Sequence, residues 1–169
     1  MDFTIRTVRP EEYETLGELT GRAYLDDGLL AFGDSDWYLN HLRDVAGRAA
    51  LTDVLVAVDE KGAVLGGVTF VPGPGAMGDI AREGEAAIRM LAVGHAARGR
   101  GVGEALVRAC VERARAVPGC ARIVLSTQEN MRTAHRIYER LGFLRVPERD
   151  WRPIPEEPEF VLLTYALEF

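Results

Sequence analysis

The segment 86–127 constrains the fold most, because two short apolar runs flank a glycine-rich turn and an amphipathic stretch. The runs 86–93 and 122–127 have the length and composition of buried strands. Residues 101–117 place apolar side chains at helical spacing, and Pro118-Gly119 ends the helix. This succession predicts an α/β fold.

The patterns on either side of this segment extend the same organisation to the whole chain. Its 169 residues suit one domain with a substantial core, and no repeat or composition break divides them. We therefore predict a single domain over 1–169. Further strands are expected at 3–8, 54–58, 63–71, 143–146 and 160–167, further helices at 10–24, at about 34–45 and at 129–141, and irregular connections at 72–84 and 147–158.

Composition excludes several classes of protein. No run of about 18 apolar residues exists, so no membrane span is expected. The N-terminus lacks the basic-then-apolar order of a signal peptide. Cys110 and Cys120 have neither CxxC spacing nor a nearby histidine partner, which predicts reduced thiols without a disulfide or a metal site. These features favour a metal-free cytoplasmic protein.

Charge is unevenly distributed along the chain. The net charge is −6, which argues against a general nucleic-acid binder. From His95 to Arg152 there are twelve arginines and six acidic residues, so this stretch carries +6 and the remainder −12. A basic stretch can meet an anionic ligand, and an acidic remainder a cationic one. Because Lys61 is the only lysine beside nineteen arginines, codon bias is an alternative explanation.

The turn between the strand 86–93 and the following helix is suited to holding phosphate. It contains Gly99, Gly101 and Gly103. Arg98 precedes the first of these glycines, and Arg100 stands between the first two. Glycines allow successive backbone N–H groups to face one concavity, and the helix adds its positive N-terminal end. The arginines add charge for phosphate contact. A strand-to-helix turn that binds no ligand is the alternative.

Spacing separates this turn from two common nucleotide-binding motifs. The P-loop requires Gly-Lys-Ser or Gly-Lys-Thr, and the chain contains neither. The dinucleotide motif GxGxxG would require a glycine where Glu104 stands. What remains is Arg-x-x-Gly-x-Gly after a strand and before a helix.

Two segments resemble the GNAT superfamily of N-acetyltransferases. The run Arg98-Gly99-Arg100-Gly101-Val102-Gly103, after Arg89-Met90-Leu91-Ala92-Val93, resembles the family's Arg/Gln-x-x-Gly-x-Gly/Ala motif for the CoA pyrophosphate. The segment from Ala134 through Tyr138 to Gly142-Phe143 is similar to its Ala-x-x-x-Tyr-x-x-x-Gly-Phe segment. The resemblance implies a central mixed β-sheet flanked by helices.

The chain departs from the family pattern at two places. His95 stands where the family often has proline, ahead of the phosphate-binding amides. Met131 stands where it often has asparagine, and Asn130 falls one residue early. Since one residue turns a helical side chain by about 100°, we expect Asn130 to cap the helix rather than to contact CoA.

The resemblance implies acetyl-CoA as co-substrate, bound between two splayed parallel strands. The backbone of Leu91 and Val93 is then expected to pair with pantetheine, and an N–H near Leu91 or Ala92 to polarise the thioester carbonyl. Tyr138 takes the general-acid position, with a packed core tyrosine as the alternative. The implied cofactor-binding residues are Leu91, Ala92, Val93, Arg98, Gly99, Arg100, Gly101, Val102 and Gly103.

The general base and the acceptor site are less defined. Glu85 precedes the strand that faces the thioester and is the first candidate base, with Glu83 second and an exposed loop acid as the alternative. Residues 72–84 and 147–158 and the first two helices are expected to form the acceptor walls. Asp26 and Asp27 could hold a cationic amine or form a solvated turn. Aromatic candidates in these walls are Trp37, Tyr38 and Trp151.

The resulting prediction is an N-acetyltransferase. It would move an acetyl group from acetyl-CoA to a primary amine of a small molecule or peptide by direct attack in a ternary complex. A non-catalytic acetyl-CoA-binding module is the main alternative, and a nucleotide-phosphate binder of another fold is a weaker one. No nucleic-acid or membrane partner is expected, while the strand 160–167 has an apolar face that could pair across a homodimer.

Overall fold

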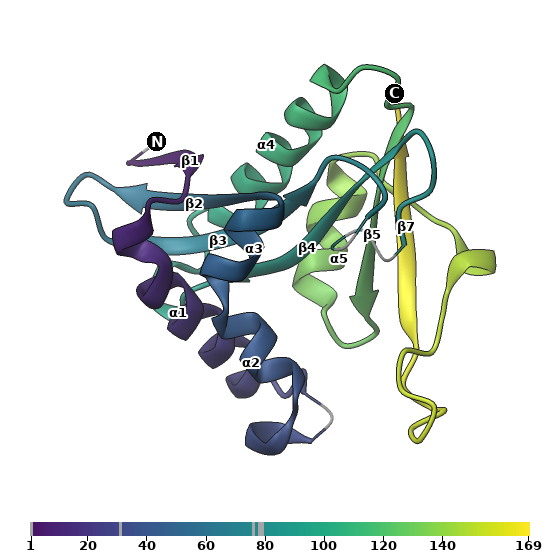
Figure 1. The fold of residues 1–169 in the computed structure, drawn as a ribbon, viewed down its shortest axis with the longest axis horizontal. Helices are drawn as coiled ribbons and strands as arrows, with labels where there is room; N and C mark the ends of the chain where they lie inside the picture. The colour runs from purple at the N-terminus through teal and green to yellow at the C-terminus, as the bar shows by residue number, and fades with distance from the viewer. Residues whose placement is uncertain (1, 31, 76, 78–79) are drawn as a thin grey trace. The chain divides into compact units, whose positions relative to one another are not determined.

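The protein is described by a computed structural model that covers residues 2–30, 32–75, 77 and 80–169 (Figure 1). Within these residues, seven strands form one mixed sheet in the order β1-β2-β3-β4-β5-β7-β6. The predicted mixed sheet with flanking helices is thereby confirmed. The strands are β1 (Phe3–Thr7), β2 (Asp53–Asp59), β3 (Val64–Val71), β4 (Glu85–Val93), β5 (Arg122–Gln128), β6 (Leu144–Arg145) and β7 (Leu162–Glu168). The α-helices are α1 (Tyr13–Asp26), α2 (Tyr38–Arg43), α3 (Val45–Leu51), α4 (Val102–Ala116) and α5 (Arg132–Arg140).

The chain divides into two compact units. The first contains residues 1–70 and 90–109, and the second contains 71–89 and 110–169. The divisions fall inside three elements, so β3, β4 and α4 each contribute residues to both units. In β4 the division lies between Arg89 and Met90.

In the first unit, β1, β2 and β3 form an antiparallel meander. Alternating valines of β2 face a core that α1 and α3 cover, which explains why the run 54–58 reads as a strand. The buried members of this core are Val8, Leu16, Val45, Val54, Val56 and Val58.

Helices α1 and α2 approach closely because α1 carries glycine at the contact. A Cβ atom on Gly17 would lie 2.4 Å from the carbonyl oxygen of Arg43, and one on Gly21 would lie 3.1 Å from the Leu39 side chain. Glycine at these two positions, one helical turn apart, lets the backbone at the end of α2 lie against α1.

The single helix predicted at about 34–45 is wrong. Residues 33–35 form a short 3-10 turn (η2, Gly33–Ser35), and α2 and α3 are separate helices that meet at Asp44. The Asp44 carboxylate accepts the Gly47 N–H at 2.9 Å and caps α3. Such side-chain-to-backbone bonds compete with a continuous helix, so apolar periodicity alone overestimated its length.

The second unit combines parallel and antiparallel pairing. β4 pairs in parallel with β5, and β7 pairs antiparallel with both β5 and β6. Its core contains Val71, Ala81, Ala87, Val124 and Ala166. β7 pairs with β5 along its whole length, and its pairing across a homodimer stays a prediction.

Helix α5 ends as its sequence predicts. Gly142 has φ of 94°, in the left-handed region, and the Phe143 N–H donates to the Tyr138 carbonyl at 2.9 Å.

Within the described part of the chain, no helix is long and apolar enough to cross a membrane.

Replacing Gly17 by Ala should destabilise the fold. Alanine favours a helix by about 1 kcal/mol over glycine, but its methyl group cannot fit 2.4 Å from a backbone oxygen. We expect α1 and α2 to separate, with the free energy of unfolding lowered by about 1–3 kcal/mol in urea denaturation. Gly73→Ala is the matched control, since nothing lies within 4 Å of its added Cβ, and it should stay near wild type. Equal stability of both variants would contradict the close packing.

Candidate functional site

Strand β4 changes its backbone conformation in the middle. Its residues Glu85–Ile88 pair in parallel with Arg122–Leu125 of β5, and the pairing register ends there. Two residues later Met90 has φ of 54°, and it is the one non-glycine residue with positive φ in the described part of the chain. A left-handed residue redirects the following N–H and carbonyl groups, so the backbone of 91–93 leaves the direction of the preceding ladder.

The residues that follow this change are held from the other side. Gly66 of β3 lies so close that a Cβ there would be 2.6 Å from the Ala92 carbonyl oxygen. The Gly94 N–H donates to the Leu65 carbonyl at 2.9 Å. The end of β4 is therefore fixed against β3 within the first unit.

The glycine-rich turn has the backbone that its sequence predicts. Gly99 and Gly101 have φ of 80° and 79°, and nothing lies within 4 Å of a Cβ built on either. Helix α4 begins at Val102, and its first internal bond joins the Ala105 N–H to the Gly101 carbonyl at 3.0 Å. The N–H groups of Val102 and Gly103 precede this bond, at the helix end where amides lack acceptors within the helix. An open turn thus leads into the positive end of a helix, which suits an anion.

Both arginines of the turn have carboxylate partners. Arg98 donates two hydrogen bonds to the Asp27 carboxylate, at 2.8 and 3.2 Å, and a third to the Val93 carbonyl at 3.4 Å. Arg100 donates to Asp2 at 2.6 Å. These exposed pairs are weak enough to exchange for a phosphate.

The acidic pair at the C-terminal end of α1 therefore lies beside the turn. Asp27 binds Arg98, and Asp26 lies 3.1 Å from the imidazole Nε2 of His95. An amine site or a solvated turn was predicted for this pair, and the contacts with His95 and Arg98 were not. The opposite charges of residues 26–27 and of the turn were the only sign of these contacts in the sequence. The two segments lie far apart in the sequence, so spacing rules could not pair them.

Tyr138 is buried in the second unit, with 3% of its surface exposed. Its ring centroid lies 5.7 Å from those of Phe143 and Tyr165. Burial, with smaller contributions from Cys110 and Tyr165, raises the pKa of the Tyr138 hydroxyl well above its ordinary value. The phenol stays protonated at neutral pH, as a proton donor must.

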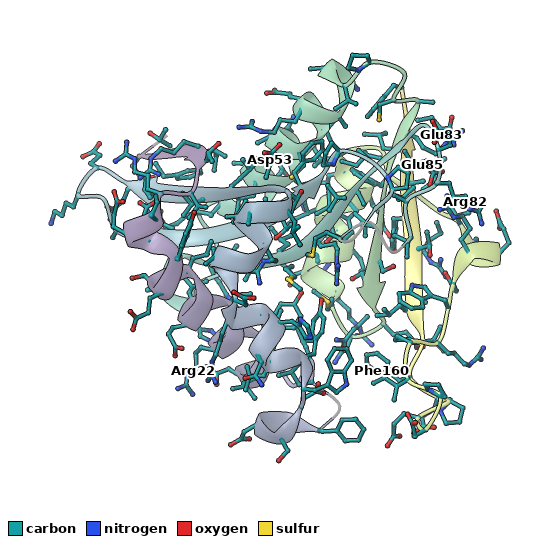
Figure 2. All side chains as sticks on the ribbon, viewed as in Figure 1. Arg22, Asp53, Arg82, Glu83, Glu85 and Phe160 are labelled. Carbon is teal, nitrogen blue, oxygen red and sulfur yellow. The ribbon has the colours of Figure 1, made fainter. Side chains whose placement is uncertain are left out.

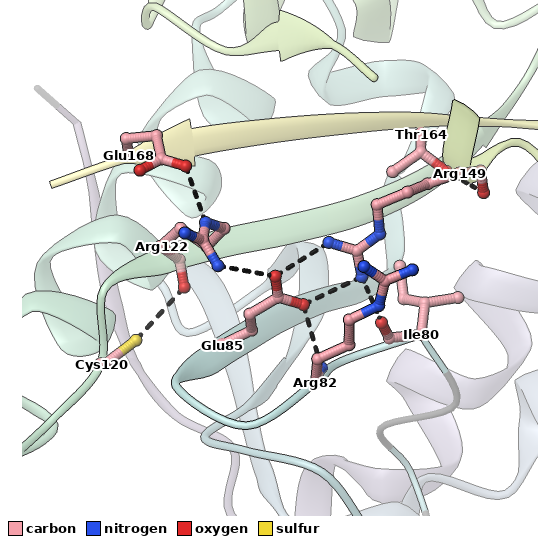
Figure 3. Close-up of polar contacts among 8 residues, drawn as sticks. All are labelled: Ile80, Arg82, Glu85, Cys120, Arg122, Arg149, Thr164 and Glu168. Carbon is pink, nitrogen blue, oxygen red and sulfur yellow. Dashed lines mark hydrogen bonds and ion pairs between the residues drawn. The ribbon is translucent and has the colours of Figure 1, made fainter. Parts of the chain in front are cut away.

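Glu85 begins β4 and is held between two arginines (Figure 3). Its carboxylate accepts Nη1 and Nη2 of Arg149 at 2.8 and 2.9 Å, Nη1 of Arg122 at 3.0 Å and the backbone N–H of Arg82 at 2.9 Å. Burial alone would raise the pKa of Glu85, but these hydrogen bonds outweigh it and lower the pKa to about 2. Such a weak base is poorly suited to taking a proton at neutral pH. The second candidate, Glu83, is exposed to solvent (Figure 2).

The aromatic candidates have different surroundings. Trp37 is 59% exposed at the start of α2, in edge contact with Tyr38 and His41. Trp151 is partly buried, and its indole N–H donates to the Ser126 hydroxyl at 3.0 Å.

The two cysteines are not joined in a disulfide; Cys110 is buried and Cys120 partly buried. Among the described residues, no group of three or more histidine, cysteine or acidic side chains is placed to hold a metal ion.

Solved structures of known proteins share this fold. A GCN5-related N-acetyltransferase from Kribbella flavida is 22% identical, with a TM-score of 0.72 over 99% of this chain and 98% of its own. A ribosomal-protein-alanine N-acetyltransferase from Brucella melitensis is 18% identical, with a TM-score of 0.73 over 98% and 99%. A phosphinothricin acetyltransferase from Sinorhizobium meliloti, solved in complex with acetyl-CoA, is 16% identical, with a TM-score of 0.73 over 100% and 89%.

Sequence comparison gives the family. No curated protein sequence matches the chain. Residues 13–143, which include the glycine-rich turn and Tyr138, match the family model described as the acetyltransferase (GNAT) family. The chain therefore belongs to the GNAT family of acetyltransferases.

Proposed function

We propose that the protein transfers an acetyl group from acetyl-CoA to a primary amine of a small molecule or peptide, by direct attack in a ternary complex. The observation that carries the proposal is the open turn at Gly99 and Gly101, which leads into the N-terminus of α4 in a chain of the GNAT family. The acetyl-CoA bound in the Sinorhizobium meliloti relative supports the choice of donor.

The turn would hold the donor through its pyrophosphate. The N–H groups of residues 99–103 supply dipoles, and Arg98 and Arg100 supply charge that now neutralises Asp27 and Asp2. Leu91 and Val93 would pair with pantetheine through their backbone, in the manner of an added strand.

The left-handed conformation of Met90 supports a role for the backbone beyond it. An N–H group at Leu91 or Ala92 would donate to the thioester carbonyl and stabilise negative charge as the amine attacks. The N–C bond then forms and the C–S bond breaks, which leaves CoA as a thiolate.

Tyr138 would protonate that thiolate and regain its proton from solvent. The hydroxyl has a proton to give at neutral pH even at a tyrosine's ordinary pKa. Burial raises the pKa of Tyr138, which makes it a weaker acid in the protein without ligand. The attacking nitrogen must lose one proton in the same reaction, and we propose that this proton leaves through water, because the contacts of Glu85 disfavour it as the acceptor.

The choice of a primary amine rests on two observations. The relatives named for phosphinothricin and for a ribosomal-protein alanine are a small-molecule and a protein acetyltransferase. The charge of −12 outside residues 95–152 favours a basic acceptor.

The proposal is tested by following CoA thiol release with the purified chain and acetyl-CoA. A polyamine, an amino sugar, an amino acid and a peptide with N-terminal alanine cover the acceptor classes. We expect amine-dependent release with at least one of them. Tight acetyl-CoA binding without turnover on any amine would instead favour a non-catalytic acetyl-CoA-binding module, and absence of binding would reject both functions.

Tyr138→Phe should lower kcat by about 10²–10⁴-fold, the usual contribution of a general acid. Acetyl-CoA affinity, measured by calorimetry, should stay unchanged because only one hydroxyl is removed. Tyr165→Phe is the matched control, since its ring lies 5.7 Å away and its hydroxyl donates to Glu139 instead. A wild-type kcat in Tyr138→Phe would remove Tyr138 from the mechanism.

Arg98→Glu should weaken acetyl-CoA binding at least about tenfold, because it removes one charged phosphate contact and adds repulsion. Arg108→Glu makes the same change of charge on the exposed face of α4 and should have little effect. Asp27→Asn separates two roles of Arg98, since it removes the carboxylate that Arg98 now contacts. We expect Asp27→Asn to bind acetyl-CoA as tightly as wild type or more tightly. A loss of affinity as large as in Arg98→Glu would mean that Arg98 only stabilises the turn through Asp27 and does not contact phosphate.

A further inference from the structure

The acceptor positions of the Glu85 carboxylate are all occupied by hydrogen bonds within the second unit. Its side chain is 2% exposed, and its two oxygens accept four hydrogen bonds, from Arg149 twice, from Arg122 and from the Arg82 N–H. A carboxylate offers about four acceptor positions, so these partners use all of them. The group is built to hold its neighbours rather than to meet a substrate.

Arg149 connects the carboxylate to two segments of the chain. It belongs to the short 3-10 turn η4 (Pro147–Arg149), whose backbone is held by the Thr164 hydroxyl through the Arg149 carbonyl at 2.8 Å. Its Nη2 atom also donates to the Ile80 carbonyl at 2.7 Å. One guanidinium therefore ties the end of the loop 72–84 to the start of the connection 147–158, and Glu85 supplies the charge that holds it (Figure 3).

The residues after Arg149 are fixed in turn against the sheet. Asp150 accepts two hydrogen bonds from Arg145, at 3.0 and 2.9 Å, and the Thr164 N–H at 2.8 Å. Trp151 forms a backbone bridge to Leu162. Its indole is hydrogen-bonded to Ser126, the residue that follows the last β5 residue paired with β4. Arg149, which pairs with Glu85 in a contact that we call the clasp, is thus followed two residues later by an aromatic side chain that is hydrogen-bonded to β5.

Apolar packing joins the same two segments. Ile80 from the loop and Val146, directly before the connection, pack on one core with Ala87 of β4 and Val124 of β5. Val124 and Ser126 are two residues apart on β5, so their side chains share one face of the sheet. The clasp, the two segments and Trp151 consequently form one wall over that face.

We propose that Glu85 is a positioning residue that sets the acceptor-side wall of residues 80–82 and 147–151 through Arg149, and that it does not take the proton of the amine. The expected kinetic effect of Glu85 rests on the proposed acetyl transfer. The structural part of the proposal, the dependence of this wall on Glu85, holds whether or not the chain turns over an amine.

The kinetic test compares Glu85→Gln with Arg149→Gln, using the amine that gives turnover. Both should raise KM for the amine about tenfold. Both should leave kcat within about fivefold of wild type and leave the acid limb of the pH profile of kcat in place. A general base behaves differently, because Glu85→Gln would then lower kcat by about 10²–10⁴-fold and abolish that limb. That result would overturn the proposal.

Two controls separate positioning from loss of the fold. Glu112→Gln removes an exposed carboxylate of α4, away from the wall, and should match wild type. Arg149→Lys keeps the positive charge beside Glu85 but cannot make the forked contact that also reaches the Ile80 carbonyl. It should raise KM for the amine less than Arg149→Gln does. Equal kinetics of Arg149→Lys, Arg149→Gln and wild type would contradict the clasp.

Hydrogen–deuterium exchange tests the wall without any turnover. In Glu85→Gln, peptides that contain residues 80–82 and 147–151 should exchange faster than in wild type, while peptides from 98–103 should not change. Unchanged exchange in the first two segments would overturn the positioning role, even in an active enzyme. Faster exchange in a chain that acetylates nothing would support the clasp and reject only the proposed function.

Discussion

The left-handed backbone of Met90 is the constraint on which the arrangement of β4 depends. A residue with a side chain adopts this conformation at a cost of about 1–3 kcal/mol and keeps it only where its surroundings impose it. Here they do, because Glu85–Ile88 are held in the parallel ladder with β5 and Gly94 is bonded to Leu65 of β3. The pairing of β4 with β5 therefore ends before Met90, while the chain just after β4 stays bonded to β3.

Local features of the chain were predictable because they depend on neighbours in the sequence. The strands at 54–58 and 122–127 follow from apolar runs, and Gly142 ends α5 in the conformation that glycine favours. The prediction failed where a side chain intervened. Asp44 divides the expected helix by capping α3, and apolar spacing carries no information about that bond.

The ion pairs of the candidate site could not be predicted, for a different reason. Arg98 meets Asp27 across 71 positions of sequence, and Arg149 meets Glu85 across 64. Spacing rules reach only a few residues, so they identified the glycine-rich turn but not what its arginines contact. They also made Glu85 the first candidate base from its position alone, although the partners that decide its chemistry come from distant segments. Tyr138 shows the contrast, since burial raises its pKa without any arginine to oppose it.

The carboxylates beside the glycine-rich turn have a kinetic consequence. With Arg98 against Asp27 and Arg100 against Asp2, the turn presents little net charge at a distance. Long-range attraction of a polyphosphate would then be weak, and its association rate would respond little to ionic strength. The turn would discriminate among anions only on contact. Phosphate oxygens then replace the carboxylates at the guanidinium groups, and the backbone amides recognise the shape of a pyrophosphate. The turn would be slow to attract anions in general and selective among those that reach it.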